Sequence, residues 1–199
     1  MRIIGLTGPT GAGKSTLSVP AQQLGIATID CDAVARKVTE AGNPALFALQ
    51  QVFGADILSA EGALLRPILA QKAFASPVAT QKLNQTILPF IMQEINAQIA
   101  ALQMAGVQTV LLDAPTLYES GADALCQSVI AVLAPAEVRL ARIMARDGIT
   151  QEAALQRMQA GKPDDFYKNR ADYILQNNGN AQDFTRRAEA VLQKICKGE

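Results

Sequence analysis

The sequence contains no histidine, so histidine-based acid–base catalysis and histidine ligation of a metal are excluded. It also carries no net charge, because Lys and Arg total 18 and Asp and Glu total 18. A balanced chain has no broad electrostatic footprint for nucleic acid or for an anionic membrane. We therefore expect neither partner, and any functional positive charge must be local.

Cysteine is scarce and scattered. Cys31, Cys126 and Cys196 lie far apart, are odd in number and form no Cys-x-x-Cys pair. This usage is typical of free thiols in a reducing compartment and argues against a disulfide framework or a zinc site. No apolar run reaches the ~18 residues that a membrane-spanning helix needs, and Met1 leads directly into an expected strand without a visible signal peptide. We therefore expect a cytoplasmic protein.

The 199 residues are 49% hydrophobic and 18% charged, which suits one α/β domain with a lid or a small insertion. Short, continuous apolar runs alternate with helical patterns, as in parallel strands that are covered on both faces. These features predict a doubly wound parallel sheet. The expected strands are residues 2–7, 26–30, 109–113, 128–134 and 173–176.

Helices are expected between these strands. The first, at about 13–24, contains Pro20, which should bend its axis, and ends at Gly25. Residues 44–105 have a helical pattern without a convincing strand, which indicates a helical insertion beside the sheet. The other expectations are breaks in the insertion at Gly54, Gly62, Pro77 and Pro89, a helix from near Asp32 towards Thr39, helices over 136–147 and 150–160, a polar, mobile segment over 161–170, and a C-terminal helix that ends near Lys194.

A phosphate-binding loop follows the first expected strand. Residues 8–15, Gly-Pro-Thr-Gly-Ala-Gly-Lys-Ser, fit G-x-x-x-x-G-K-[ST] at every fixed position. Glycines let backbone N–H groups wrap a phosphate, and the N-terminus of the following helix adds positive potential. Lys14 can reach the β- and γ-phosphates, and the Ser15 hydroxyl can ligate Mg²⁺ with Thr16 beside it. The sequence therefore predicts binding of ATP, in which Gly11, Ala12 and Gly13 also take part.

The loop alone does not define the reaction. A switch GTPase would need Asn-Lys-x-Asp and Asp-x-x-Gly strings, and a transporter ATPase would need Leu-Ser-Gly-Gly-Gln, but none of these occurs. A small-molecule kinase needs only the loop, a base near the acceptor hydroxyl and arginines that spread the charge of the transferred phosphoryl group. This class is the one we favour.

Two acidic residues lie at expected strand ends, where open α/β sheets bind ligands. Asp32 can accept the proton of an attacking hydroxyl, and it can also cap the helix that follows. Asp113 can hold the shell of Mg²⁺, or it can serve as a strand-end turn residue before Pro115. Both interpretations stay open for each residue.

Arginines recur on one expected helix. Arg139, Arg142 and Arg146 fall at i, i+3 and i+7, which places them on a single face. Such a row is either a solvated surface or a clamp for phosphate, because guanidinium groups suit phosphate oxygens. After a phosphate loop and before a polar segment, a phosphate-clamping lid is the favoured interpretation, and Arg157 continues the pattern.

Together these segments resemble the dephospho-coenzyme A kinase family, in order and over nearly the whole chain. The phosphate loop is shared by many enzymes, but the acidic segments in this order are more specific. The likeness is carried by Ile4–Gly8 leading into Gly11–Thr16, Ile29-Asp30-Cys31-Asp32 with Ala35-Arg36, Leu65-Arg66 followed by Phe74–Pro77, Asp113–Glu119, Arg142, Arg146-Asp147, Arg157, Ala171-Asp172 and Asn177-Asn178-Gly179.

The resemblance implies transfer of the γ-phosphate of ATP to the ribose 3′-hydroxyl of dephospho-coenzyme A, with Mg²⁺ as cofactor. It implies Asp32 as base and Arg142 as lid arginine, with Lys14 at the phosphates and with Arg36, Arg66, Arg146 and Arg157 as substrate or lid residues. It also implies a P-loop kinase-like fold in three parts. These are a core of about 1–32, 106–136 and 171–199, a helical acceptor-binding region of about 33–105 and a lid of about 137–170.

Three positions depart from the family pattern. Leu88 stands where the family usually has histidine, Thr116 replaces a leucine, and Gly161 lies where a glutamine is usual. Two alternatives therefore stay open. One is a P-loop kinase for another hydroxyl or phosphate acceptor, such as a nucleoside monophosphate or a shikimate-type substrate. The other is a non-catalytic ATP-binding protein.

Overall fold

The computed structural model describes residues 1–198. The chain divides into two compact units. The first comprises Met1–Ile29 and Leu102–Glu199, and the second comprises Asp30–Ala101. The predicted lid region, about 137–170, lies within the first unit, whereas the predicted acceptor-binding region corresponds closely to the second.

The first unit is built on a five-stranded sheet of order β2-β3-β1-β4-β5. The pairings of β1 with β3, of β1 with β4 and of β4 with β5 are parallel, which confirms the predicted sheet. The central strand β1 lies between β3 and β4, so the order of the strands reverses at β1. Open α/β sheets bind ligands at the carboxyl ends of the strands beside such a reversal, which here is the end of β1. The strands are β1 (Arg2–Thr7), β2 (Ala27–Asp30), β3 (Thr109–Asp113), β4 (Ser128–Leu133) and β5 (Tyr173–Gln176).

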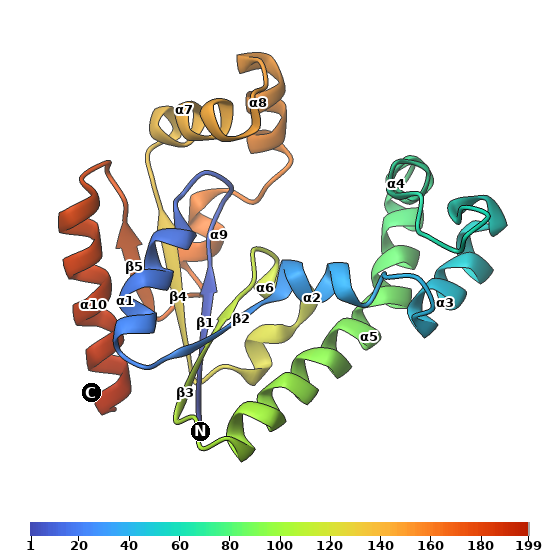
Figure 1. The fold of residues 1–199 in the computed structure, drawn as a ribbon. Helices are drawn as coiled ribbons and strands as arrows, with labels where there is room; N and C mark the ends of the chain where they lie inside the picture. Colours follow the sequence, from blue (N-terminus) through green and yellow to red (C-terminus); the bar gives the residue numbers. More distant parts are fainter. Residues whose placement is uncertain (199) are drawn as a thin grey trace. The chain divides into compact units, whose positions relative to one another are not determined.

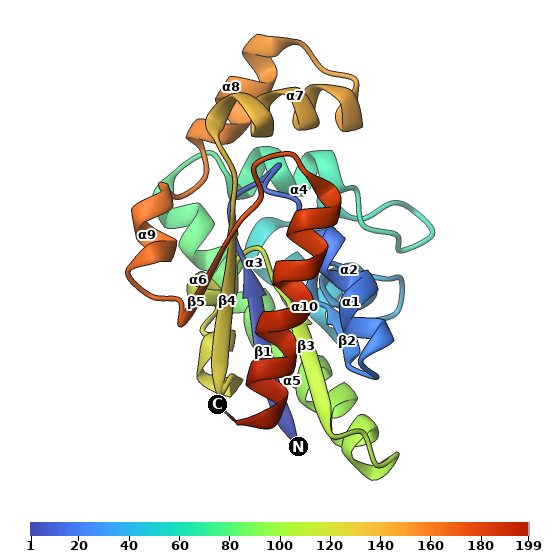
Figure 2. The same cartoon turned by 90° about the vertical axis from the view of Figure 1, so that its left-hand side faces the viewer.

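One face of the sheet is covered by α1 (Ser18–Gln23) and α10 (Ala181–Lys197), and Figure 2 shows α10 lying across the strands. Successive side chains of a strand point to opposite faces, so Ile4 and Leu6 of β1 pack on this side. α10 contributes a buried stripe at helical spacing, and full burial of a large apolar side chain such as Phe184 stabilises the fold by about 1.5–3 kcal/mol. The stripe consists of Phe184, Ala188, Leu192 and Ile195.

The opposite face is covered by α6 (Leu117–Ser120), the 3₁₀ turn η3 (Ala122–Leu125) and α9 (Asp164–Lys168). A Cβ atom at Gly5 would lie 2.8 Å from Cδ2 of Leu117, so β1 requires glycine on this side. Tyr167 of α9 is 4% exposed and packs against Ala131 and Leu133 of β4. The expectation of a polar, mobile segment over 161–170 missed this short helix, because one aromatic side chain among polar neighbours anchors it.

The segment after the phosphate loop differs from the single bent helix that was expected. Lys14–Leu17 form a 3₁₀ turn, η1, and the α-helix α1 begins only at Ser18. Pro20 is the third residue of α1, where a backbone N–H would have no partner within the helix, so the proline fits the first turn of α1 and does not interrupt it. α1 ends before Gly25, as expected, where φ is +70° and the Ile26 N–H closes on the Ala21 carbonyl at 2.9 Å.

Two helices follow β4, as expected. α7 (Ala136–Asp147) ends at Gly148, whose φ of +62° suits a helix C-terminus. α8 (Gln151–Gln159) starts at Thr150, whose hydroxyl accepts a hydrogen bond from the Ala153 N–H. Figure 1 shows both helices beyond the carboxyl end of β4, which is the end of the sheet that carries the phosphate loop.

The second unit is helical, with one isolated antiparallel bridge between Leu58 and Leu64. It has a small core of its own, made by Leu46, Leu49, Ile57, Leu69 and Ala73. Its elements are α2 (Cys31–Lys37), α3 (Pro44–Phe53), the 3₁₀ turn η2 (Ala55–Ile57), α4 (Arg66–Ala73) and α5 (Pro77–Met104), which runs on past the end of the unit.

The predicted break at Pro89 is wrong, because α5 continues through this residue. A proline inside a helix removes only the hydrogen bond to the carbonyl four residues earlier, here that of Gln85. Gln85 is exposed, so water can satisfy this carbonyl, and the turns on both sides hold the helix together. Gly54 and Pro77 do mark helix ends, as expected.

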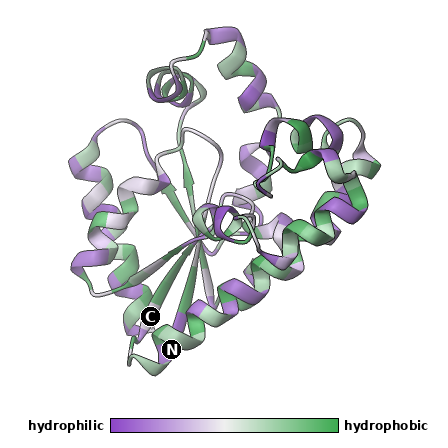
Figure 3. Ribbon diagram, turned by 45° about the vertical axis from the view of Figure 1, so that its right-hand side comes forward, coloured by the Kyte–Doolittle hydropathy of each residue, from purple (hydrophilic) through white to green (hydrophobic). Residues whose placement is uncertain are grey.

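Hydropathy follows the layers of the first unit, since the strands are the most continuously hydrophobic elements in Figure 3 and the helices carry mixed faces. Within residues 1–198, no helix combines the length and the apolar character that crossing a membrane would require.

Candidate active site

The phosphate loop connects β1 to η1, and its glycines lie against the backbone and side chains of later elements. Gly8 has φ +139°, and a Cβ atom there would overlap the carbonyl oxygen of Val132 in β4. Gly11 has φ +77°, and its Cβ atom would lie 2.8 Å from the carbonyl oxygen of Arg139 in α7. These close approaches explain why the motif needs glycine at both positions.

Lys14 spans the loop from its far end. Its Nζ donates a hydrogen bond of 2.9 Å to the carbonyl oxygen of Gly8, so the ammonium group lies over the turn that the loop encloses. Ala12 is fully buried, and its N–H donates to the Pro9 carbonyl at 3.2 Å. Ser15 is exposed and Thr16 is half-buried at the start of η1. The predicted nucleotide residues 11–16 therefore run consecutively through the end of the loop and the start of η1, with Ala12 buried beneath them.

Arg142 of α7 reaches this loop with its guanidinium group. Its Nη1 donates to the carbonyl oxygens of Gly11 at 3.3 Å and Ala12 at 3.1 Å. Its Nη2 donates to Oδ1 of Asn177 at 3.0 Å. The structure thus brings together a predicted lid residue and the predicted phosphate loop, which are about 130 positions apart in the sequence.

The other arginines of the predicted row have partners elsewhere. Nη1 of Arg139 lies 3.6 Å from Oδ1 of Asp164 at the start of α9. Arg146 donates two hydrogen bonds to its neighbour Asp147, at 2.7 and 2.8 Å, and Arg157 of α8 pairs with the same carboxylate. Arg146, and then Arg157, hold the pKa of Asp147 below its ordinary value. This carboxylate therefore ties α7 to α8.

Asp113 stands at the carboxyl end of β3, where it is half-buried and in register with Leu6 of β1. Since β1 leads directly into the phosphate loop, the Asp113 carboxylate belongs to the edge of the sheet that carries the loop. Among residues 1–198 there is no cluster of three or more Cys, Asp or Glu side chains that could hold a metal by itself.

In the second unit, the cap of α2 is Asp30 and not Asp32. Oδ1 of Asp30 accepts hydrogen bonds from the backbone N–H groups of Asp32 at 2.8 Å and Ala33 at 3.0 Å. The capping interpretation of Asp32 is therefore wrong, because the residue before the helix already fills that position. Asp32 is exposed in the first turn, and within Asp30–Ala101 its carboxylate makes no hydrogen bond or ion pair.

Arg36 and Arg66 both lie near the end of α2. Nη2 of Arg66 donates to Oγ1 of Thr39 at 2.8 Å. Thr39 is 7% exposed, and its own hydroxyl reaches the carbonyl oxygens of Ala35 and Arg36. Arg36 lies 3.9 Å from Asp30 and is well exposed. The second unit therefore carries two guanidinium groups on a short stretch of its surface.

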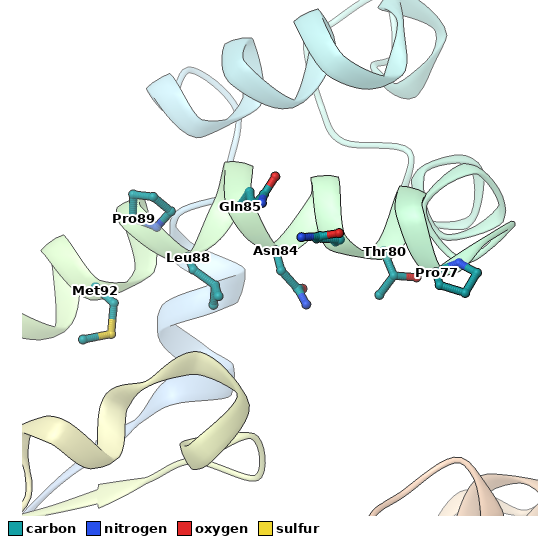
Figure 4. A pocket seen from close by; sticks show the side chains of 8 residues that line it. Pro77, Thr80, Asn84, Gln85, Leu88, Pro89 and Met92 are labelled. Atoms are coloured by element: carbon teal, nitrogen blue, oxygen red, sulfur yellow. The ribbon is translucent and has the colours of Figure 1, made fainter.

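The α5 helix of the second unit carries a shallow groove, shown in Figure 4. Four of its side chains recur every fourth residue and lie along one side of the helix in this view. They are Thr80, Asn84, Leu88 and Met92. The departure from the family pattern at Leu88 therefore falls in the middle of this groove, where it makes the surface more apolar than a histidine would.

Sequence reasoning did not single out the side chain of Asn177. The Asn-Asn-Gly turn was visible, but a turn motif does not tell which amide points inwards. Asn177 is 3% exposed, and its Nδ2 donates to the Ala12 carbonyl at 2.9 Å. One feature of the sequence could have indicated this role. Asn177 comes directly after the last expected strand, at the edge of the sheet that carries the loop.

A parallel sheet with a glycine-rich phosphate loop after its first strand, and an arginine held against that loop, defines the class of P-loop small-molecule kinases. Shikimate kinase from Acinetobacter baumannii shares this fold, with a TM-score of 0.57, 20% identity and coverage of 100% of this chain and 95% of that chain. Dephospho-CoA kinase from Campylobacter jejuni is more similar, with a TM-score of 0.73, 29% identity and coverage of 100% and 99%.

The sequence comparisons identify one family within this class. The family model described as dephospho-CoA kinase matches residues 2–183. A dephospho-CoA kinase from Corynebacterium diphtheriae is 41% identical over 196 residues, which are 98% of each chain. The chain therefore belongs to the dephospho-CoA kinase family. The predictions of this family, of a kinase and of a role in coenzyme A biosynthesis are confirmed, and the two alternatives are not favoured.

Proposed function

We propose that the chain transfers the γ-phosphoryl group of ATP to the ribose 3′-hydroxyl of dephospho-coenzyme A, giving coenzyme A and ADP. In this reaction the bond between the γ-phosphorus and the β–γ bridging oxygen breaks, a bond from the phosphorus to the 3′-oxygen forms, and the hydroxyl proton leaves. The observation that carries the proposal is the loop of residues 8–15 with Arg142 held against it, in a chain of this family.

The nucleotide phosphates are proposed to lie in the loop, on the N–H groups of Gly11, Ala12 and Gly13 and of the first residues of η1. The glycines that pack against Val132 and Arg139 give the loop a fixed shape, so little reorganisation is needed when a phosphate binds. Lys14, whose ammonium group lies over the same turn, would exchange its carbonyl partner for phosphate oxygens. Its positive charge makes that exchange favourable.

Arg142 is proposed to neutralise the charge of the transferred group. A guanidinium group keeps its charge at every relevant pH and offers paired donors to phosphate oxygens. In this structure its partners in the loop are neutral carbonyl oxygens. These bind a guanidinium group more weakly than phosphate oxygens would. Arg146 and Arg157 support the lid at the C-terminal end of α7 through Asp147.

The available donors fit Mg²⁺ bound together with the nucleotide. Ser15 offers a hydroxyl and Asp113 a carboxylate, which are hard oxygen ligands, and Mg²⁺ usually takes one or two such protein ligands plus phosphates and water. We propose that these two residues hold the ion or its water shell. When bound, Mg²⁺ would neutralise charge on the β- and γ-phosphates.

Asp32 is proposed as the base that takes the 3′-hydroxyl proton, and Arg36 and Arg66 as cationic contacts for the acceptor. Because Asp30 caps α2, the Asp32 carboxylate keeps its acceptor capacity for a ligand. The groove of α5, which mixes amide and apolar side chains, offers further acceptor contacts. Catalysis then depends on Asp32, whereas helix capping depends on Asp30.

The test uses these two neighbouring aspartates as a matched pair. We expect Asp32→Asn to lower kcat by ~10²–10⁴ while ATP affinity stays nearly unchanged. Asp30→Asn is the control, because asparagine also caps helices, and it should keep most of the turnover. Steady-state ADP release and ATP titration measure both effects. Full turnover of Asp32→Asn would remove the base from the proposal.

We also propose that the protein works in the cytoplasm. No disulfide bond joins the cysteines within residues 1–198, which fits a reducing compartment. Cell fractionation with antibody detection would test this location.

A further inference from the structure

Asn177 is one of the few buried polar residues of the described chain. It follows directly after β5, and its backbone N–H donates to the Leu133 carbonyl at 2.7 Å. This bond continues the ladder between β4 and β5 by one residue and fixes the Asn177 backbone in place. The position of the backbone therefore does not depend on the side chain.

The Asn177 amide joins the phosphate loop to Arg142. Its Nδ2 donates to the Ala12 carbonyl at 2.9 Å, and its Oδ1 accepts from Nη2 of Arg142 at 3.0 Å. Nη1 of Arg142 donates to the same Ala12 carbonyl at 3.1 Å. The carbonyl, the guanidinium group and the amide thus form a closed set in which each member bonds to the other two.

The primary amide of Asn177 satisfies this set because it supplies a donor and an acceptor at once. The side chain must offer one donor and one acceptor from the same buried group, and leucine of similar shape offers neither. Aspartate keeps the acceptor for Arg142 but turns a carboxylate oxygen towards the Ala12 carbonyl. The fit is also tight, because a Cβ atom at Gly13 would overlap Nδ2 of Asn177.

We propose that Asn177 is a positioning residue that fixes the Arg142 guanidinium group at the phosphate loop. An arginine on a helix surface has four rotatable side-chain bonds, and the amide holds its outer end in one arrangement beside Gly11 and Ala12. The phosphate charge of ATP then meets a guanidinium group that is already in place, which is the preorganisation that transition-state stabilisation needs. The inference rests on the proposed role of Arg142 in the transfer.

The experiment is a double-mutant cycle on the full chain with Asn177→Leu, Arg142→Met and the double variant. ADP release in the presence of dephospho-coenzyme A gives kcat and the KM for each substrate, and direct titration gives the Kd for ATP. We expect Asn177→Leu to lower kcat/KM for ATP by ~10–100-fold, as for the loss of a hydrogen bond to a charged group. The KM for dephospho-coenzyme A should stay unchanged.

The decisive result is the double variant, which should match Arg142→Met within about twofold, because Asn177 acts through Arg142. The proposal would be overturned if the loss of kcat/KM in the double variant equalled the product of the two single-variant losses. It would also be overturned if Asn177→Leu left kcat/KM for ATP unchanged. Asn180→Leu is the control, since Asn180 lies in the same loop but caps α10, where its Oδ1 accepts a hydrogen bond from the Asp183 N–H. It should lower thermal stability without changing kcat/KM for ATP.

Two further measurements distinguish a failure of this proposal from a folding defect and from a failure of the proposed function. If Asn177→Leu does not fold, Asn177→Ala takes its place, because alanine also removes both the donor and the acceptor, and a folded alanine variant with unchanged kcat/KM for ATP would contradict the inference. If dephospho-coenzyme A fails to stimulate ADP release by the unchanged chain, the proposed function fails. The cycle in Kd for ATP still decides whether Asn177 and Arg142 act as one unit.

Discussion

At the scale of single residues, the loop needs Gly13 for two reasons. Its φ of +89° is a conformation that other residues adopt at a cost, and a Cβ atom would overlap Nδ2 of Asn177 and lie 3.3 Å from Nη1 of Arg142. We expect Gly13→Ala to lower kcat/KM for ATP by ~10²-fold or more, because the displaced groups include the proposed lid arginine. Steady-state ADP release measures this loss.

Gly25 provides the control for that substitution. It also has positive φ, +70°, but no atom lies within 4 Å of a Cβ atom placed there. Gly25→Ala should therefore lower the free energy of unfolding by about 1–2 kcal/mol and leave kcat/KM for ATP unchanged. Equal kinetic losses in both variants would show that backbone strain, and not the contact with Asn177, explains the effect.

The thiols differ in their environment. Burial, and then the nearby Asp123, raise the pKa of Cys126 to about 12, whereas Cys196 is exposed on α10. Because the thiolate is the reactive form, we expect an aromatic disulfide reagent at pH 8 to label Cys196 quickly and Cys126 only upon unfolding. Peptide mapping by mass spectrometry identifies the labelled residue, and rapid labelling of Cys126 in the folded protein would contradict this expectation.

How much of the site could be predicted depends on the range of each signal. The phosphate loop is local, since all its groups lie within eight consecutive residues, so the sequence pattern was sufficient. Asn177 meets Ala12 across 165 positions, and that contact arises from the order of strands in the sheet. Capping by Asp32 was one of two interpretations left open, and the observed cap of α2 lies two residues earlier, at Asp30, because both aspartates are equally good caps in a sequence pattern.

At the scale of elements, the predictions for three helices, α7, α9 and α5, had different outcomes. α7 was expected over 136–147, and this is its observed extent. α9 has only five residues, too few for a periodic pattern, and it is held by packing of Tyr167 against β4. α5 was expected to break at Pro89 but continues through it, because the helical hydrogen bonds on both sides of the proline hold the helix together.

The ion pairs between α7 and α8 make the stability of this region depend on pH. The pKa of Asp147 is lowered by Arg146 and then by Arg157, so its folded value lies below the unfolded value of ~3.9. Such a group contributes stability above about pH 4, and this contribution is lost as the pH falls through the folded pKa.

Thermal unfolding of the chain and of Asp147→Asn, measured from pH 7 to pH 3, tests this linkage. We expect the unchanged chain to have the higher Tm at pH 7 and the difference to shrink as the pH falls below about 4. A difference in Tm that stays constant over the whole range would show that the two arginines do not act through the charge of Asp147.

At the scale of the whole molecule, the alternation of strands and helices was enough to predict a parallel α/β sheet. The order β2-β3-β1-β4-β5 was not predicted, since each strand is a similar apolar run and its neighbours are chosen by packing. That order is nonetheless what matters for the site. It places β1 in the centre, so that the loop after β1, the end of β3 and the segment after β5 share one edge of the sheet.

The central claim, that the chain phosphorylates dephospho-coenzyme A, is tested most directly by ADP release from ATP and Mg²⁺ with purified protein. The acceptors to compare are dephospho-coenzyme A, AMP, adenosine and shikimate, with a reaction that contains no acceptor as the baseline. We predict that dephospho-coenzyme A alone stimulates release and that mass spectrometry identifies coenzyme A as the product. Stimulation by another acceptor, or ATP binding without any acceptor-dependent turnover, would contradict the claim.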